Sequence, residues 1–375
     1  MARIYFDHNA TTPLHPAARA AILEALDEAG NPSSLHAEGR RARDRVERAR
    51  DQVAALVGAT RDEIVLTSGG TEANNLAVRG LARRARERQP RRRLIVTSPV
   101  EHPSVDEVCA GLEADGFRRL QLGVDSDGRI DLDELARILS DEVALVTVQL
   151  ANHEIGTLQP VAEMVALARR VGALLHTDAV QACGKIAVDA RALGVDALTL
   201  SAHKLGGPKG VGALFVRSGV DFAPLLLGGH QERERRPGTE NVAGVVGFGA
   251  AAAHAAPAAP ALEALRDRFE RGALALGARR HGGGAAPRVP TTSNVAFAGV
   301  DGELLMQALD LEGVAVSTGA ACSSGSLEPS PVIARIGVGN PREALRVSFG
   351  RGNSADEVDE LLRLLPPLLD RIRRA

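Results

Sequence analysis

The chain has 375 residues, more than one small core can organise, so a large α/β body or a two-domain protein is expected. Hydrophobic residues make up 45% and charged residues 25%, the ordinary balance of a globular protein. A formal net charge of −2 and an aromatic content of 2% argue against nucleic-acid binding and against attraction to an anionic membrane. No apolar run reaches membrane-spanning length and the first residues do not resemble a secretory signal, so we expect a cytoplasmic protein.

Short apolar runs alternate with helical patterns through the first two-thirds of the chain. Helical patterns begin near Thr71 and Pro103 and extend over 161–171. The runs that are typical of strands span 64–66, 94–96, 144–148, 173–175, 197–200 and 211–216. This rhythm predicts a largely parallel sheet covered by helices. Ligands of such sheets bind in the loops that follow the carboxyl ends of the strands.

The last third of the chain has a different composition. An Ala/Pro-rich stretch over 250–261 predicts a hinge or a connecting helix into a second domain, although a plain linker would have the same composition. A closing amphipathic helix is expected from Ser354, after strands near 294–297, 314–316 and 345–349. The basic run over 82–93 lies at a helix end and loop, and we interpret it as a solvated face rather than a docking site.

Lysine is scarce, which limits the candidates for lysine chemistry to Lys185, Lys204 and Lys209. Lys204 directly follows a strand and precedes the Gly-rich turn 205–208, so it is the best placed of the three for Schiff-base chemistry. The cysteines, Cys109, Cys183 and Cys322, are too widely spaced for a disulfide framework or a CxxC metal site. Cys322 lies among small residues in an accessible loop, which suits a nucleophilic thiolate. We assign the other two cysteines to packing.

Further polar motifs follow the predicted strands. The turn 67–72 lets a phosphate approach backbone amides at a helix N-terminus, where Thr71 adds a hydroxyl donor, but Thr71 acting as the helix N-cap explains the motif equally well. Asp178 closes a strand, where its carboxylate either pairs with a protonated pyridine nitrogen or caps the next turn. His102 is placed to stack on a planar cofactor or to move a proton, although a lone histidine there is more often structural.

Taken in order, the motifs resemble the cysteine desulfurases of the NifS/IscS type, within the class V aminotransferase-like enzymes that depend on pyridoxal phosphate (PLP). The similarity extends over essentially the whole chain. It rests on YFDHNATTP (5–13), GNPSSLH (30–36), TSGGTEANN (67–75), VEHPSV (100–105), ANHEIGTLQP (151–160), HTDAVQACGK (176–185), SAHKLGGPKGVG (201–212), GGHQERERRPGTEN (228–241), STGAACSSGSLEPS (317–330) and RVSFGR (346–351).

The resemblance implies an α/β fold of the PLP-dependent transferase type (fold type I). A large domain over 15–254 would hold a mainly parallel seven-stranded sheet. A smaller α+β domain over 1–14 and 255–375 would carry a mobile cysteine loop at about 317–330. The implied reaction removes sulfur from L-cysteine, releases L-alanine and leaves a persulfide on Cys322 for transfer to a sulfur acceptor such as an iron–sulfur scaffold.

The resemblance also implies roles for single residues. Lys204, His102 and Cys322 would be catalytic, with Lys204 holding PLP covalently and later moving the substrate α-proton. Thr239 would reach the cofactor phosphate across a homodimer interface, while Asn152 and Arg346 would bind the substrate carboxylate. No resident metal is implied within one chain, apart from Cys322 as a transient iron–sulfur ligand. The cofactor-binding set would be Gly70, Thr71, Asn152, Asp178, Gln181, Ser201, His203, Lys204 and Thr239.

Alternatives stay open at this stage. Another class V PLP enzyme, such as a selenocysteine lyase or a small-amino-acid aminotransferase, would keep Lys204 and Asp178, so only Cys322 and its long loop argue against it. A cofactor-free sulfur carrier or iron–sulfur scaffold is disfavoured, because a protein-held cluster normally needs four ligands. Iron–sulfur assembly, tRNA thiolation, and thiamine or molybdenum cofactor synthesis are all compatible acceptor pathways. His8 and Pro331 depart from the family's frequent residues without removing a catalytic group.

Overall fold

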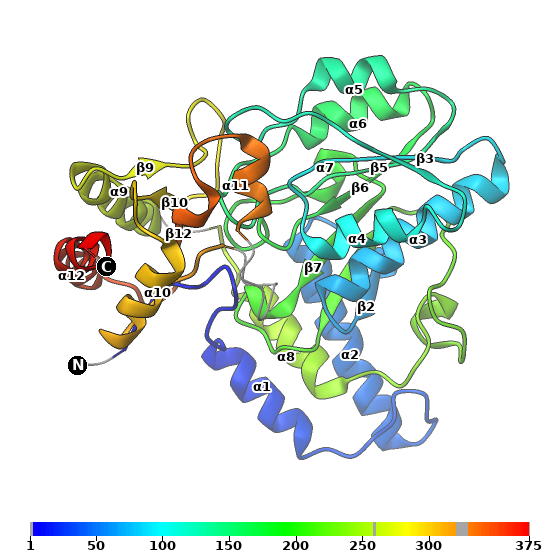
Figure 1. Ribbon diagram of the computed structural model, residues 1–375. Helices are drawn as coiled ribbons and strands as arrows, with labels where there is room; N and C mark the ends of the chain where they lie inside the picture. Colours follow the sequence, from blue (N-terminus) through cyan, green and yellow to red (C-terminus); the bar gives the residue numbers. More distant parts are fainter. Residues whose placement is uncertain (1–2, 258–259, 320–328, 375) are drawn as a thin grey trace.

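The computed structural model describes residues 3–257, 260–319 and 329–374. Its largest sheet has seven strands in the order β2-β8-β7-β6-β5-β3-β4 (Figure 1). These strands are β2 (Ile64–Thr67), β3 (Leu94–Thr97), β4 (Arg118–Gln121), β5 (Val143–Thr147), β6 (Leu174–Asp178), β7 (Ala197–Ser201) and β8 (Gly212–Val216). Neighbouring strands run parallel, except that β8 is antiparallel to both β2 and β7. The predicted α/β fold with a mainly parallel seven-stranded sheet is confirmed.

Both faces of this sheet are buried, each against a different set of helices. Successive side chains of a strand point to opposite faces, so one strand contributes to both cores. In β8, Leu214 and Val216 pack with α3 (Gly70–Arg88) and α4 (Pro103–Gly111), whereas Phe215 packs on the opposite side. That opposite side is covered by α2 (Ala37–Leu56), α6 (Val161–Arg169) and α8 (Val242–Ala253). Completing this part of the chain are α1 (Pro16–Leu26), α5 (Leu132–Ile138) and α7 (Ala190–Leu193).

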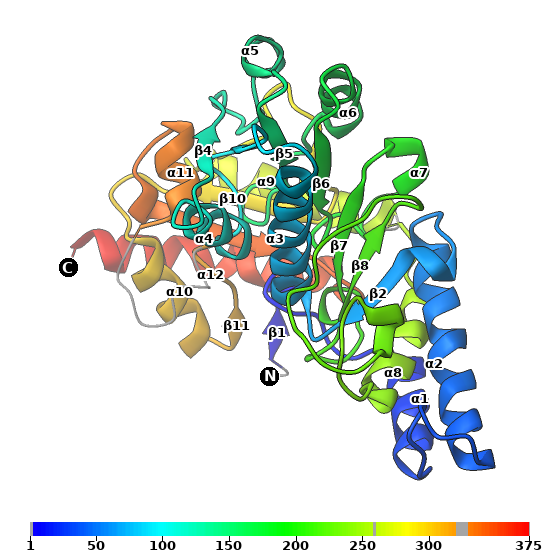
Figure 2. The same ribbon diagram turned by 90° about the vertical axis from the view of Figure 1, so that its right-hand side faces the viewer.

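A second apolar core lies around smaller sheets. One has the order β12-β10-β9, and in the other β1 pairs in parallel with β11. Figure 2 shows the helices of this part, α9, α10 and α12, apart from the group formed by α1, α2 and α8. The elements are β1 (Ile4–Tyr5), α9 (Pro260–Ala275), β9 (Arg279–Arg280), β10 (Thr292–Ala296), α10 (Gly302–Leu311), β11 (Val314–Ala315), α11 (Pro331–Ile336), β12 (Ala344–Ser348) and α12 (Ala355–Arg374).

The first residues of the chain belong to this second core. Phe6 packs there with Phe269 and Phe349, the latter from the chain's last hundred residues. The Ala/Pro-rich stretch 250–261 includes the end of α8 at Ala253 and the start of α9 at Pro260. Domain boundaries at 14/15 and 254/255 agree with this arrangement and stay a prediction. Within the described ranges, no helix is both long and apolar enough to cross a membrane.

The parallel arrangement brings the carboxyl ends of β2, β3, β5, β6 and β7 to one edge of the sheet. Thr67, Thr97 and Thr147 end three of these strands, while Asp178 and Ser201 end the other two. The polar motifs of the sequence follow these residues. The topology of the sheet therefore brings together segments that are distant in sequence, such as those beginning at residues 68 and 202. A short 3₁₀ helix, η2 (Ala202–Lys204), follows β7 and carries the predicted catalytic lysine.

A histidine lies inside the large sheet. His176 of β6 is fully buried, with Nδ1 2.8 Å from Thr147 Oγ1 of β5 and Nε2 3.0 Å from Thr199 Oγ1 of β7. Burial lowers the pKa of His176 from 6.5 to about 3, because the charged imidazolium would lose its hydration. Below pH 6.5 the unfolded chain therefore binds a proton at this residue that the folded chain does not bind.

His176 should make the protein sensitive to acid. The neutral imidazole stabilises the fold fully above pH 6.5, and this contribution is lost as the pH falls toward about 3. We expect the substitution His176→Asn, which keeps a polar group beside both threonines, to flatten the pH dependence by roughly 3 kcal/mol between pH 6.5 and about pH 4. Urea unfolding of both proteins across this range measures the difference, and equal pH slopes would contradict it.

Candidate active site

A cavity of about 260 Å³ lies at the carboxyl edge of the large sheet. Eight residues predicted from the sequence line it: Gly70, Thr71, His102, Asp178, Gln181, Ser201, His203 and Lys204. Residues that were not predicted complete the wall: Ala10, Asn74, Ser104, Gln149, Ala151, His153 and Val180. The structure therefore gathers most of the candidate cofactor residues around one space.

Lys204 enters the cavity from η2, and the N-terminal segment lies against its amine. The Nζ atom donates hydrogen bonds to the carbonyl oxygens of Asn9 and Ala10, the latter at 2.7 Å. Asn9 is itself tied to the small sheets, because its backbone N–H donates to Ser348 Oγ at 2.9 Å and its side chain donates to Thr292 Oγ1 at 3.0 Å. The position of the Lys204 amine is thus set by two backbone carbonyls, one of which belongs to a residue that the small sheet β12-β10-β9 holds in place.

The N-terminus of α3 forms one end of the cavity. The N-cap is Gly69, which has no side chain to bond the amides of the first turn, and Thr71 is the second residue of the helix. The reading of Thr71 as the N-cap is therefore wrong. Those amides and the helix dipole favour an anion at this end. An added Cβ at Gly70 would lie 3.1 Å from Val180 Cγ2, so a glycine keeps the approach open.

Asp178 lies on a different wall of the cavity, at the end of β6. Its Oδ1 accepts a hydrogen bond from the backbone N–H of Val180 at 2.9 Å, and its Oδ2 accepts one from Asn74 Nδ2 at 2.7 Å. The carboxylate thus caps the following turn and also lines the cavity. Two donors hold it in one orientation, as a partner for a protonated ring nitrogen requires.

Asn74 also connects Asp178 to His102. Asn74 Nδ2 donates to Ser104 Oγ at 2.8 Å, and Ser104 Oγ lies 2.7 Å from His102 Nδ1. His102 is the N-cap of α4, where Nδ1 accepts the backbone N–H of Ser104 at 3.1 Å. Since Nδ1 accepts the backbone N–H of Ser104, we assign the proton of the neutral ring to Nε2, and the hydroxyl of Ser104 then donates to Nδ1. Reasoning from sequence missed Asn74, although the motif TEANN contained it.

A second lysine, one of the three candidates from sequence that was not assigned to the site, lies close to it. Lys185 is buried, donating from Nζ to Asn9 Oδ1 at 2.5 Å and to Gln181 Oε1. Gln181 Nε2 in turn donates to the carbonyl oxygen of Asn9 at 2.9 Å. Burial, with the nearby charges of Lys204 and Arg346, holds the pKa of Lys185 well below its usual value. Its position four residues after Gln181 was the signal in the sequence, because a turn brings that spacing together.

Arg346 and Asn152 lie behind the cavity wall. Arg346 is buried on β12, where Nη2 donates to Asp7 Oδ1 at 2.7 Å and Nη1 to the carbonyl oxygen of His153 at 3.1 Å. Its Nε has no hydrogen-bond partner among the described residues. Asn152 is not on the cavity wall, since its side chain accepts from the N–H groups of Glu154 and Ile155 and donates to the carbonyl of Val100. Its predicted contact with the cofactor stays a prediction.

Two predicted residues remain, Cys322 and Thr239. Cys322 lies outside the described residues. On either side of that gap, Gly319 and Ser330 both contact Glu154: Ser330 Oγ is 2.5 Å from Glu154 Oε2, and a Cβ at Gly319 would lie 2.6 Å from the same atom. Burial raises the pKa of Glu154 to about 7. Thr239 is exposed and does not line this cavity.

The cavity fits PLP. Helix amides with Ser201 and His203 offer donors for a phosphate, Asp178 offers a carboxylate for a ring nitrogen, and Lys204 offers an amine for the aldehyde. Arg346 Nε, which lacks a partner among the described residues, gives a buried donor for a substrate carboxylate. One cavity therefore offers complementary groups to the phosphate, the ring nitrogen and the aldehyde of the cofactor.

Comparisons with known proteins agree with this geometry. Residues 4–361 match the family model described as "Aminotransferase class-V". The chain is 47% identical to a cysteine desulfurase of Cereibacter sphaeroides, with 100% of this chain and 97% of the relative covered. It is 42% identical to the cysteine desulfurase NifS of Azotobacter vinelandii, with 100% and 94% covered. A solved NifS-like protein superposes with a TM-score of 0.91 at 35% identity, covering 98% of this chain and 100% of that one.

Loss of Asn74 should weaken both the fold and cofactor binding. The substitution Asn74→Ala removes the bridge between Asp178 and Ser104, and we expect it to destabilise the protein by roughly 1–3 kcal/mol. With Asp178 less constrained, PLP binding should weaken roughly tenfold, which corresponds to about 1.4 kcal/mol. PLP titration followed by absorbance measures this. Asn75→Ala is the control, since Asn75 is only partly buried and donates to the carbonyl of Thr71 in its own helix; equal affinities in the two variants would refute the bridge.

Proposed function

The chain belongs to the class V aminotransferase family and is a PLP-dependent cysteine desulfurase, and from that premise we propose which of its residues perform each step. The enzyme acts on L-cysteine and passes the sulfur to an acceptor. The observation that carries the assignment is the cavity in which Lys204, Asp178 and His102 meet at the ends of different strands. Each residue reaches it from a separate motif, so the proposal depends on the topology rather than on one segment.

PLP, when bound, supplies an electron sink for bonds broken at the substrate's α-carbon. Lys204 would attach the cofactor through Nζ, and the carbonyls of Asn9 and Ala10 that now accept from this amine would hold it close when it is released. From there Nζ takes the α-proton of cysteine. Asp178 would keep the ring nitrogen protonated, its orientation fixed by Asn74 and Val180.

His102 would stack on the cofactor ring and take part in proton transfer. Its Nδ1 is engaged by Ser104, so Nε2 is the atom that would exchange a proton within the cavity. The phosphate would be bound by the first turn of α3 with Ser201 and His203. Burial and the charges of Lys204 and Lys209 lower the pKa of His203 to about 4, so at neutral pH it acts as a neutral donor.

Arg346 would bind the substrate carboxylate. Its guanidinium is oriented by Asp7 and by the carbonyl of His153, a cavity residue, while Nε keeps an open donor position among the described residues. Asn152 supports this region indirectly, since it fixes the backbone at Glu154 and Ile155.

Cys322 would accept the sulfur. Its thiolate attacks the sulfur atom of the substrate; an S–S bond forms, the substrate's C–S bond breaks, and the electron pair stays on the substrate carbon, which is protonated to give alanine. The carbonyl of Gly319, three residues earlier, lies 3.4 Å from Arg346 Nη1. The chain therefore leaves the described structure beside the proposed substrate site.

We further propose that the enzyme works in the cytoplasm as a homodimer in which Thr239 serves the partner's cofactor phosphate. The support is that Thr239 is exposed and lies outside its own chain's cavity. An iron–sulfur scaffold is the acceptor that the resemblance implies. Selenocysteine lyase activity is the second candidate, and the long loop around Cys322 argues against it.

Removing the amine of Lys204 should abolish the cofactor chemistry. We expect Lys204→Ala to lose the visible absorbance of bound PLP and to release no alanine from L-cysteine, because Lys204 carries the only amine among the described residues that line the cavity. Lys209→Ala, a change in an exposed lysine of the following turn, should keep both signals. Absorbance spectra and an alanine assay test this. A coloured and active Lys204→Ala protein would refute the assignment.

Removing the thiol of Cys322 should separate cofactor binding from sulfur transfer. We expect Cys322→Ser to keep the PLP spectrum while its persulfide and alanine yields with L-cysteine fall to background. Cys109→Ser and Cys183→Ser are controls, because both thiols are buried and lie away from solvent. Persulfide labelling followed by mass spectrometry gives the result. Persulfide found on the Cys322→Ser protein would contradict the proposal.

A further inference from the structure

Three successive residues in the segment 228–241 adopt a left-handed backbone conformation. Glu232, Arg233 and Glu234 have φ values of 49°, 57° and 66°. Non-glycine residues rarely adopt this conformation, and it persists only where surrounding contacts enforce it. Thr239 lies in the same segment, five residues after Glu234. The contacts that hold the strained residues therefore also restrict where Thr239 can lie.

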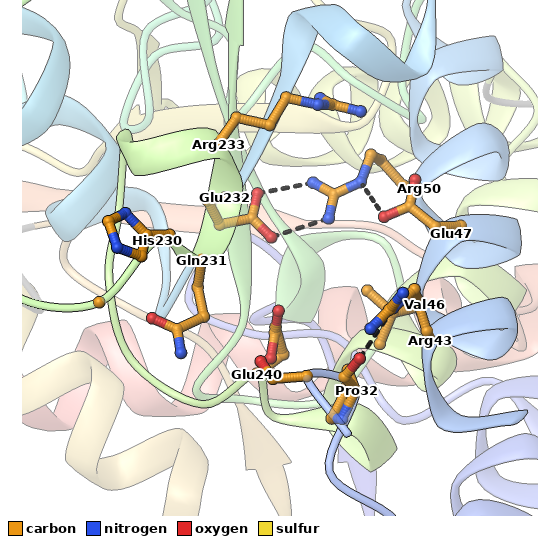
Figure 3. A pocket seen from close by; sticks show the side chains of 12 residues that line it. Pro32, Arg43, Val46, Glu47, Arg50, His230, Gln231, Glu232, Arg233 and Glu240 are labelled. Atoms are coloured by element: carbon orange, nitrogen blue, oxygen red, sulfur yellow. Dashed lines mark hydrogen bonds and ion pairs between the residues drawn. The ribbon is translucent and has the colours of Figure 1, made fainter. Parts of the chain in front are cut away.

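A buried ion pair holds the strained residues. Arg50 Nη1 lies 2.6 Å from Glu232 Oε2 and Nη2 lies 2.8 Å from Oε1, a bidentate contact drawn in Figure 3. The exposed fractions of the two side chains are 5% and 3%. Glu232 Oε2 also accepts the backbone N–H of Leu66 at 2.8 Å, and Arg50 donates to the carbonyl of Ile64 at 3.1 Å. Both charges are therefore fully engaged, as a buried pair requires.

A cavity lies beside this pair. It has a volume of about 550 Å³ and is lined by residues of the segment, of α2 and of the turn before α2: Pro32, Ser33, Arg43, Val46, Glu47, Arg50, Gly229, His230, Gln231, Glu232, Arg233 and Glu240. In Figure 3, Glu232 reaches toward Arg50 along one side of this space. Among the described residues, the pair of Arg50 and Glu232 is the one ion pair that joins the segment to α2.

A second ion pair attaches the other end of the segment. Arg236 donates from Nε to Glu72 Oε1 at 2.7 Å and from Nη2 to Glu72 Oε2 at 3.1 Å. Glu72 lies in the first turn of α3 and also accepts the N–H of Ser68 at 2.7 Å. Glu232 thus contacts β2, and Arg236 contacts the first turn of α3, which forms the phosphate end of the cavity. A third ion pair, at 2.7 Å between Arg233 Nη2 and Asp62 Oδ1, joins the segment to the 3₁₀ turn before β2. Thr239 follows three residues after Arg236 and is exposed.

We propose that Arg50 and Glu232 are positioning residues that hold the segment 228–241 so that Thr239 reaches the cofactor phosphate of a second copy of this chain. The inference rests on the homodimer under the proposed function. It adds that the ion pair of each subunit serves the active site of its partner and not its own. Breaking the pair lets the strained backbone relax, and Thr239 leaves its place.

Mixed dimers test the direction of this effect. Two chains with different affinity tags are co-expressed and purified over both tags, so that each dimer has one intact Lys204. When Glu232→Gln pairs with Lys204→Ala, the intact lysine is served by the unaltered segment of its partner. When the doubly substituted chain Lys204→Ala/Glu232→Gln pairs with wild type, the intact lysine is served by the altered segment.

We expect the first mixed dimer to match a dimer of wild type with Lys204→Ala in PLP dissociation rate and in alanine formation per site. The second should release PLP faster and form alanine more slowly, by about tenfold to a hundredfold, as expected when a positioned group is misplaced. PLP release is followed by absorbance and does not depend on turnover. Equal behaviour of the two mixed dimers, or the reverse order, would overturn the inference.

Controls separate positioning from folding. The double substitution Arg50→Met/Glu232→Leu replaces the pair by apolar side chains, which leaves no unpaired buried charge, although Leu66 and Ile64 each lose a hydrogen-bond partner; we expect a cooperatively folded protein with a modestly lower melting temperature together with fast PLP release. Arg268→Ala breaks an exposed bidentate pair with Asp359, at 2.6 Å for both contacts, and should change neither quantity. Normal PLP retention in the double variant would also overturn the inference.

The homodimer proposal fails in a different way. A wild-type protein that is monomeric by light scattering yet active would overturn both the dimer and the positioning role. A wild-type dimer that is active, combined with indistinguishable mixed dimers, would overturn the positioning role alone. A wild-type protein that forms no alanine would instead contradict the assigned residues.

Discussion

The site depends on how the N-terminal segment crosses the carboxyl edge of the large sheet, and Asn9 is the residue through which it is held. Its carbonyl accepts from Lys204 and Gln181, and its side chain contacts Lys185 and Thr292. Lys204 and Gln181 follow strands of the large sheet, whereas Thr292 belongs to the small one. A single buried asparagine therefore fixes the catalytic lysine relative to both cores. Any movement of one core relative to the other would change the position of the reacting amine.

Most of the fold could be predicted because its signals are local. The apolar runs and their polar ends marked β2, β3, β5, β6 and β7, and a parallel sheet then placed their carboxyl ends together. The pairing of β1 with β11 could not be predicted, because two strands of two residues each, about 300 positions apart, leave no periodicity. The site residues at strand ends could also be predicted, because they directly follow the apolar runs that mark the strands.

The residues that support the site were harder to find. Asn74 lies within a helix, where an asparagine usually reads as part of a solvated face, and only the fold shows that it joins Asp178 to Ser104. Thr71 fits an N-cap by composition, yet the helix begins one residue before it. Asn152 belongs to a recognisable motif, but its side chain satisfies the backbone of its own turn rather than lining the cavity. Such roles depend on which hydrogen-bond partners the tertiary structure supplies.

The two described cysteines have a consequence for sulfur chemistry. Burial raises the pKa of the Cys183 thiol to about 12 and raises that of Cys109 as well. At neutral pH neither forms an appreciable thiolate, and only a thiolate exchanges with a persulfide or a disulfide. Both thiols are thus unreactive toward persulfides at neutral pH. Neither thiol would therefore take up sulfur that the enzyme removes from its substrate, and this sulfur stays available for transfer to an acceptor.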